Sequence, residues 1–315
     1  MRVKPRLIRC FAAVAFAATL SPAAVTAQTT AVADSVSAAP AASSADTART
    51  QTAVPPAVRG RVGCVIPPSR NYFKEASTRR AWLWGAGRGN VLDTYLTPLE
   101  YTGPDFALLH RTERRARWGN SRVTVLAEYT GHLAYLHSPT DDGKEWDGEL
   151  SAAGGWLYNW RPAARLRLCA GGMTEVFGGF TYNTRASNNP AQGRLGASLL
   201  AAALAEYTFP LFRREAKATL GLSAPVAGVQ FAPQYGQSYY EIFSLGHSGG
   251  TVHFTHPANA PSARLAALLE VPVLGARVTL GWLSDVRQSK LGGLKRHAWR
   301  NTFMIGYTRS LCILR

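Results

Sequence analysis

The sequence predicts an all-β fold: a transmembrane antiparallel up-and-down β-barrel of about twelve strands, preceded by a signal peptide and a disordered tail. Three observations lead to this prediction. Apolar residues recur at every second position in many segments, aromatic residues gather near the ends of these segments, and the links between segments alternate in length. The composition is that of a folded chain, because 46% of the residues are hydrophobic and the 29 glycines follow no collagen-like period.

Residues 1–27 have the pattern of a cleavable secretory signal peptide. A basic region precedes an apolar run at residues 11–20, and small residues then lead to a cleavage site after Ala27. The apolar run is too short to cross a bilayer as a helix. The sequence therefore predicts export rather than an N-terminal membrane anchor.

Residues 28–78 form a low-complexity tail and linker rich in Ala, Ser, Thr and Pro. Most of this segment offers no bulky side chains that could pack into a core, so we expect it to be disordered. The predicted organisation is a signal peptide at residues 1–27, the tail at residues 28–78, and the barrel at residues 79–315.

Period-two alternation is the main evidence for strands. It is clear at residues 122–129, and residues 214–223, 263–271, 277–287 and 299–308 repeat it. One face of each segment is apolar, and the other carries small, polar and charged side chains. A soluble β-sandwich whose apolar face closes on a core would show the same alternation, so this pattern alone leaves both folds open.

The lengths and links of the strands favour the membrane barrel. The predicted strands lie at residues 80–90, 103–115, 120–136, 147–160, 164–182, 194–210, 214–224, 237–246, 250–256, 263–273, 276–288 and 295–309. Long links near 91–102, 137–146, 183–193 and 225–236 alternate with tight ones. Outer-membrane barrels have long external loops, short periplasmic turns and aromatic girdles at both membrane interfaces. The sequence therefore predicts a barrel in the outer membrane of a Gram-negative bacterium.

Two motifs could suggest a bound ligand. The run Gly85-Ala86-Gly87-Arg88-Gly89 resembles a phosphate-binding loop, but no helix follows it, so we expect strand glycines. His247, His253 and His256 are close in sequence, but the predicted strands hold them apart. We therefore expect no cofactor and no metal.

The segment Gly246-His247-Ser248-Gly249 invites comparison with a known outer-membrane phospholipase, a barrel that uses a His and Ser pair. Adjacent residues on a turn rarely hold the hydrogen bond from nucleophile to base, and a third orienting group is needed. The predicted strands also place this segment at the periplasmic side, whereas that phospholipase acts at the outer leaflet. A polar turn is the preferred interpretation.

Charged residues on the predicted inward faces are the remaining site candidates. They are Arg122, Glu128, Glu206, Glu270, Arg277, Asp285 and Arg287. Ionisable residues inside a membrane protein usually pair with one another and often mark a pathway. A barrel of this size can be either filled or open, so both a salt-bridged plug and a solute pathway are possible.

The formal net charge of +16 raises the question of an anionic partner. The Lys and Arg residues are scattered and accompany no nucleic-acid motif, so we expect no nucleic acid. For an exported barrel, the expected partners are outer-membrane lipid and lipopolysaccharide, and the barrel-assembly machinery during insertion.

Four stretches of the chain resemble an uncharacterised bacterial envelope family, domain of unknown function 3316. They are residues 90–101 (NVLDTYLTPLEY), 240–246 (YEIFSLG), 285–290 (DVRQSK) and 303–307 (FMIGY). Members of this family look like outer-membrane barrels with no established catalytic residues. The resemblance implies an envelope location and supplies no site residues.

The sequence leads to two functional hypotheses. The first is a non-enzymatic outer-membrane barrel, either a small-solute channel or a structural or binding barrel acting through its external loops. The alternative is an outer-membrane lipid hydrolase similar to the phospholipase. A continuous wet lumen would favour the channel, and a blocked lumen with shaped loops would favour binding.

Overall fold

The computed structural model describes residues 77–312 apart from residues 117, 119–121, 187–188, 212–213 and 274–275. The predicted signal peptide and most of the predicted tail lie outside the described residues. The elements of the described part are β1 (Ser77–Asp93), β2 (Glu100–Arg115), β3 (Val123–His137), β4 (Lys144–Ala163), β5 (Leu166–Asn183), β6 (Ala191–Leu211), β7 (Arg214–Phe231), α1 (Tyr239–Phe243), β8 (Val252–Thr255), β9 (Ala263–Val273), β10 (Ala276–Leu291) and β11 (Leu294–Cys312). None of the helices in this part is long and apolar enough to cross a membrane.

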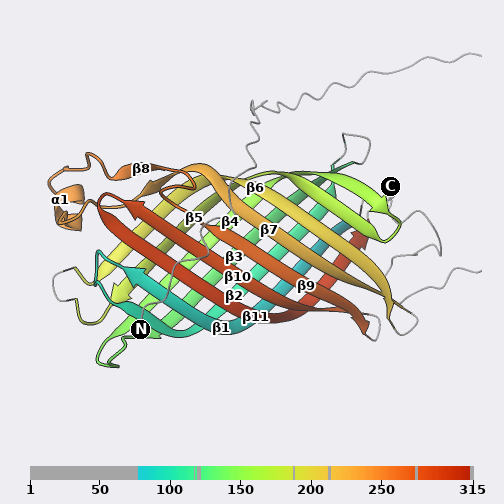
Figure 1. Ribbon diagram of the computed structural model, residues 1–315, viewed down its shortest axis with the longest axis horizontal. Coiled ribbons are helices and arrows are strands. Elements are labelled where there is room, and N and C mark those ends of the chain that lie inside the picture. The colour runs from blue at the N-terminus through green and yellow to red at the C-terminus, as the bar shows by residue number, and fades with distance from the viewer. Residues whose placement is uncertain are drawn as a thin grey trace, which may run out of the picture. The chain divides into compact units, whose positions relative to one another are not determined.

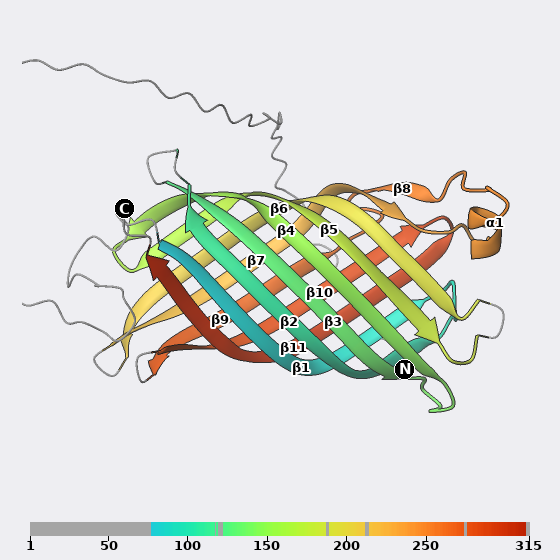
Figure 2. The same cartoon turned by 180° about the vertical axis from the view of Figure 1, so that it is seen from behind.

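Ten of the described strands form a closed barrel, as Figures 1 and 2 show from opposite sides. β1 pairs with β2 on one side and with β11 on the other, which closes the ring, and every pairing is antiparallel. β7 pairs with both β6 and β9, so β8 stands outside the wall. The predicted all-β antiparallel barrel is confirmed, with ten wall strands in place of about twelve.

The predicted strand at residues 237–246 is wrong, because this segment contains α1. The hydroxyl of Ser238 accepts a hydrogen bond from the backbone N–H of Glu241 at 3.2 Å, and the Glu241 carboxylate accepts one from the Ser238 N–H at 2.7 Å. This capping box starts a helix in an aromatic segment that otherwise reads as a strand. The predicted strand at residues 250–256 exists as β8, but it pairs only with the last residues of β7.

Side chains alternate between the outside of the barrel and its interior. On β10, Trp282 faces outward and is 46% exposed, whereas its neighbour Leu283 is buried. Asp285 and Arg287 share the inward face with Leu283, so the charged residues are the enclosed ones. This arrangement excludes the soluble β-sandwich, whose apolar face would close on a core. It is the pattern of a barrel with lipid around it.

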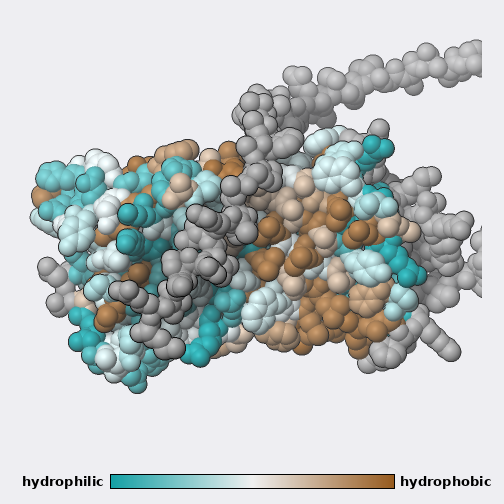
Figure 3. Space-filling model, viewed as in Figure 1, coloured by the Kyte–Doolittle hydropathy of each residue, from teal (hydrophilic) through white to brown (hydrophobic). Residues whose placement is uncertain are grey.

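The outward apolar surface does not cover the whole barrel. In Figure 3, hydrophobic residues gather on the half of the wall away from α1, and polar residues dominate the half next to α1 and β8. On β1, β10 and β11 the outward apolar side chains are Trp82, Trp84, Val278, Leu280, Trp282, Phe303, Ile305 and Tyr307. Further along the same strands most outward positions are polar: Arg88, Asn90, Gln288, Lys290, His297 and Asn301. Val286 and Trp299 are apolar exceptions that also face outward there.

The two ends of the barrel differ in their connections. The end that carries α1 holds the links β1–β2, β3–β4, β5–β6, β7–β9 and β10–β11, and we name it the loop end. The opposite turn end holds the start of β1, the end of β11 and short links such as residues 164–165. The longest link, residues 232–262 between β7 and β9, contains α1 and β8 and is named the insertion. The predicted alternation of long loops and short turns holds only in part, because the turn-end link at residues 116–122 is longer than the loop-end link at residues 292–293.

The glycine-rich run at residues 85–89 lies within β1, where close packing explains it. A Cβ atom on Gly87 would lie 1.9 Å from the backbone oxygen of Asn301 on β11, and one on Gly85 would lie 2.1 Å from that of Phe303. Any side chain at these two positions would force β1 and β11 apart. The run is a structural feature of the wall.

Candidate functional site

The interior of the barrel holds two charged clusters, with apolar side chains between them on most strands. On β3 the order differs, because Leu126 lies nearer the turn end than Glu128. The turn-end cluster comprises Arg79, Arg111, Glu113, Glu128, Arg167, Glu206, Lys217 and Glu270. The loop-end cluster comprises Asp93, Asp105, His132, Asp147, Glu149, Glu175, Arg194, Arg264, Asp285, Arg287, Arg296 and Arg300. The apolar side chains form two separate clusters, which we together name the apolar layer. One contains Ala81, Leu83, Ala107, Leu109, Ala266, Leu268, Leu283 and Met304, and the other contains Leu126, Ala153, Leu157, Cys169, Met173, Leu200, Ala202 and Leu204.

A single strand shows how the sequence produces these layers. The inward residues of β9 run from Arg264 through Ala266 and Leu268 to Glu270. All four are buried, and the two charged residues belong to different clusters. Because inward positions recur at every second residue, four successive inward side chains cross all three layers.

Ion pairs of the turn-end cluster reach across the whole interior. Arg79 Nη1 lies 3.5 Å from Glu206 Oε1, although β1 and β6 stand on opposite sides of the ring. The Glu206 carboxylate also forms an ion pair with Arg167, with Oε2 2.7 Å from Nε, and it accepts a hydrogen bond from Lys217. Arg79 pairs with Glu270 of β9 as well. These bridges connect β1 with β5, β6, β7 and β9 on the other side of the ring.

The loop-end cluster centres on Asp147 of β4. Its carboxylate lies 2.7 Å from Arg300, 3.1 Å from Arg296 and 3.1 Å from Arg194. Asp147 and Arg300 are completely buried, and their strands β4 and β11 lie on distant parts of the ring. Three guanidinium groups therefore share one carboxylate inside the barrel, and Glu149 supports two of them at 3.7–3.9 Å.

A second group of pairs in this cluster joins β5, β9 and β10. Arg287 donates two hydrogen bonds to Glu175, at 2.7 and 3.0 Å, in the bidentate geometry that suits guanidinium and carboxylate. Arg264 donates to Asp285 at 2.9 Å, and these two residues lie opposite each other in the β9–β10 register. The charges of the interior are thus neutralised locally, which buried ions require.

The structure separates the seven residues that the sequence proposed. Glu206 and Glu270 lie in the turn-end cluster, where Glu128 joins them through Arg111 at 3.6 Å. Asp285 and Arg287 lie in the loop-end cluster. The remaining two are Arg122 and Arg277, and neither belongs to a cluster. Arg122 is exposed at the turn end, where it donates to the Tyr158 hydroxyl at 3.3 Å, and Arg277 is half-buried on β10.

Sequence reasoning missed most of the loop-end cluster. Asp147, Glu149 and Ser151 occupy successive inward positions of β4, so the same alternation could have identified them. The glycines and alanines around them weaken the contrast between the two faces of β4, which makes its charged face hard to recognise from the sequence.

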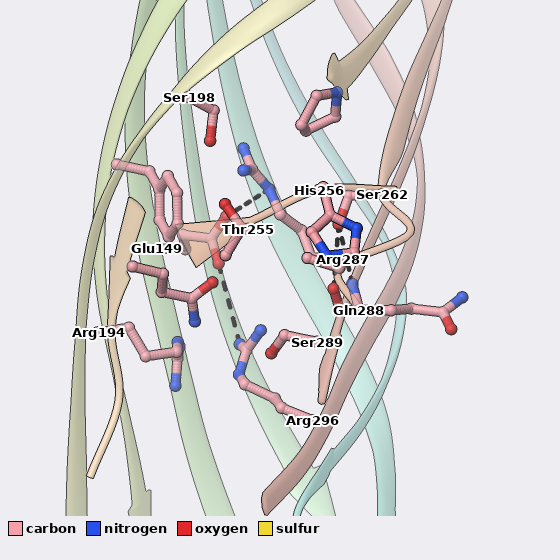
Figure 4. Close-up of a pocket in the computed structure, with 14 residues that line it drawn as sticks. Glu149, Arg194, Ser198, Thr255, His256, Ser262, Arg287, Gln288, Ser289 and Arg296 are labelled. Carbon is pink, nitrogen blue, oxygen red and sulfur yellow. Dashed lines mark hydrogen bonds and ion pairs between the residues drawn. The ribbon is translucent and has the colours of Figure 1, made fainter. Parts of the chain in front are cut away.

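A hollow opens in the wall beside the loop-end cluster, where β7 continues beyond Ser223, the last of its residues that pairs with β9. It encloses about 470 Å³ of space that includes a part open to solvent, and Figure 4 shows its lining. Arg194, Arg287 and Arg296 line it, but each already has a carboxylate within 3.1 Å. The hollow therefore offers no free charge for a ligand.

The serine and histidine side chains of the hollow have hydrogen-bond partners other than each other. In the hollow, Ser262 donates to the backbone oxygen of Gln288 at 3.3 Å, and His256 accepts from the N–H of Ala258 at 3.2 Å. Among the residues that the structure describes, no serine is hydrogen bonded to a histidine. The expected placement of residues 246–249 in a turn-end link is wrong, because α1 puts them in the insertion at the loop end. His247 and Ser248 are both exposed there.

Comparison with known proteins gives one family match and several weak structural similarities. The model of the family described as "Protein of unknown function (DUF3316)" matches residues 68–315. No curated protein matches the chain. The translocator domain of the autotransporter NalP from Neisseria meningitidis is 11% identical with a TM-score of 0.37, covering 75% of this chain and 90% of that one.

Two further solved structures show the same level of similarity. The outer membrane protease OmpT from Escherichia coli is 8% identical with a TM-score of 0.37, covering 76% of this chain and 98% of that one. An outer membrane channel from Pseudomonas putida F1 is 9% identical with a TM-score of 0.33, covering 75% and 96%. Similarities this weak carry no inference about activity.

Proposed function

The chain belongs to the family of proteins of unknown function DUF3316, and we propose that it is a non-enzymatic outer-membrane barrel with a sealed interior that binds a partner through its loop end. The observation that carries this proposal is the filled interior. Charged clusters at two levels are bridged from wall to wall, and two apolar clusters lie between them on most strands. A hydrated path for small solutes would have to break all three layers.

The outer surface supports a location in a membrane. Apolar and aromatic side chains face outward on the turn-end half, and the polar wall nearer the loop end extends beyond them. A tilted strand needs about 9–11 residues to cross a bilayer. β4, β6 and β11 have 20, 21 and 19 residues, so the barrel is long enough to project from the membrane at its loop end.

The insertion supplies the surface for a partner. Its exposed apolar side chains are Tyr235, Tyr240, Phe243, Leu245, Val252 and Phe254, each between 52% and 79% exposed. Large apolar side chains gathered in one exposed segment commonly mark an interaction site.

Two tyrosines hold the insertion in place: Tyr95 of the barrel and Tyr239 of the insertion itself. The Tyr95 hydroxyl donates to the backbone oxygen of Gln237 at 3.1 Å, and the Tyr239 hydroxyl donates to that of Gly193 at 3.2 Å. The two rings meet edge to face at 5.8 Å. Burial raises the pKa of Tyr95 to about 12, so this hydroxyl remains a donor at physiological pH. The insertion is therefore fixed to the barrel mouth.

Conductance in planar bilayers tests the sealed interior. The purified full-length protein, shown to be folded by its heat-modifiable mobility on a gel, should give no stable conductance steps. Regular steps from the folded protein would contradict the proposal and restore the solute channel.

Thiol labelling on intact cells tests the orientation. Phe243→Cys in the insertion should react with a membrane-impermeant maleimide on whole cells, in excess of the wild-type background. Arg165→Cys at the turn end is the matched control, since it is also exposed and should react only after the cells are opened. The reverse result would overturn the assignment of the loop end to the cell surface.

A further inference from the structure

Three arginines lie together on the outward surface at the turn end of β11, β1 and β2. Arg80 and Arg309 are directly opposite each other in the β1–β11 register, and Arg114 is the diagonal neighbour of Arg80 on β2. All three are exposed. We name this group the rim arginines.

The rim arginines have no acidic partner within the described part of the chain. None of them takes part in an ion pair there, whereas the inward Arg79 and Arg111 of the same strands do. The neighbouring outward positions on these strands are also free of acids: Thr78, Trp82, His110, Thr112, Tyr307 and Leu311. Like charges directly opposite each other destabilise a sheet. An external anion would remove this repulsion.

Aromatic residues occupy the outward positions between the rim arginines and the apolar part of the wall. Trp82 and Tyr307 are opposite each other in the β1–β11 register. They occupy the outward positions next to Arg80 and Arg309, on the side towards the middle of the barrel. The Arg309 guanidinium lies 5.2 Å from the centre of the Tyr307 ring, and the Trp82 ring stacks on His110 at 3.9 Å. Rings of this kind sit at the level of lipid headgroups. Beyond them the wall becomes apolar, with Ile305 and Phe303 facing outward.

We propose that the rim arginines bind the phosphate of an anionic glycerophospholipid whose acyl chains lie along the outer wall of β11, β1 and β2. The order of the groups matches that of a lipid, with cations first, then aromatic rings, then apolar side chains. This inference rests on the proposed membrane location, and the turn end assigns the lipid to the periplasmic leaflet. Guanidinium groups bind phosphate oxygens with charge-assisted hydrogen bonds.

Lipid retention measured by native mass spectrometry tests the proposal. Full-length protein is released from phosphatidylcholine nanodiscs that contain a graded fraction of phosphatidylglycerol, and retained phosphatidylglycerol is counted. Each arginine near a lipid surface contributes about 1 kcal/mol, so Arg80→Gln with Arg309→Gln should weaken apparent affinity by roughly 10- to 30-fold. Arg88→Gln is the matched control, because Arg88 is an exposed outward arginine of the same strand. It should retain phosphatidylglycerol like the wild type.

Each outcome decides the proposal. Equal retention by the wild type and the double variant would overturn it, as would equal losses in the double variant and in Arg88→Gln. Displacement of the lipid by inorganic phosphate alone would show a site for free anions and would also overturn it. Heat-modifiable mobility is checked for every variant. If the wild-type protein itself shows no heat-modifiable mobility, the membrane barrel is contradicted. If the wild type passes this check and the lipid results differ from those expected, only the lipid site is contradicted.

Discussion

Arg300 Nη2 donates to Asp147 Oδ1 at 2.7 Å, and neither side chain is accessible to solvent. The two residues belong to β11 and β4, which are separated by β1, β2 and β3 in the ring. A buried ion pair of this kind contributes little relative to a packed apolar pair, but removing one partner leaves the other charge uncompensated. The loop-end cluster should therefore be sensitive to single neutral substitutions.

Asp147→Asn tests this sensitivity. The substitution leaves Arg194, Arg296 and Arg300 without their shared carboxylate, and we expect a loss of about 3–5 kcal/mol in the free energy of unfolding. Unfolding by guanidinium chloride in detergent micelles measures this loss of free energy. Asp142→Asn is the matched control, because Asp142 pairs with Arg185 in an exposed loop, where such pairs contribute at most about 1 kcal/mol. Similar losses in the two variants would contradict the role given to the cluster.

The three-layer interior predicts how conductance responds to substitution. Arg167→Ala with Glu206→Ala removes two members of the turn-end cluster, but the apolar layer and the loop-end cluster remain. We expect this variant to stay as closed as the wild type in planar bilayers. Adding Leu204→Ser, Leu268→Ser and Asp285→Ala should produce conductance steps, because all three layers are then weakened. Conductance from the first variant would show that the turn-end cluster alone forms the seal.

How far the sequence predicts this molecule depends on the range of the interaction. Alternation within β10 predicts a wall strand with Asp285 and Arg287 on one face, because strand geometry is local. The capping box of Ser238 and Glu241 is equally local, and the aromatic residues around it obscured it. The pairing of Asp147 with Arg300 could not be predicted, since it depends on the register of every strand between β4 and β11.

The capping box predicts a pH-dependent change in α1. Hydrogen bonds from the backbone and side chain of Ser238 lower the pKa of Glu241 below its ordinary value of 4.5. A lowered pKa in the folded state contributes stability above pH 4.5, and this contribution disappears as the pH falls through the lowered value. The hydrogen-exchange protection factors of residues 239–245, which correct for the intrinsic effect of pH on exchange, should therefore fall below pH 4.5. Glu241→Gln should lose this acid step, whereas Glu215→Gln at the turn end should keep it.

The anchor from Tyr95 to the insertion gives the last prediction. Tyr95→Phe removes the hydrogen bond to the backbone oxygen of Gln237 and leaves the ring contact with Tyr239 in place. A hydrogen bond of this type contributes about 1 kcal/mol, so the insertion should open about five times more often than in the wild type. Limited proteolysis within residues 232–262 measures this opening. Tyr240→Phe is the control, because Tyr240 is 66% exposed and its hydroxyl makes no hydrogen bond within the described residues. Cleavage of Tyr95→Phe at the rate of this control would show that ring packing alone holds the insertion.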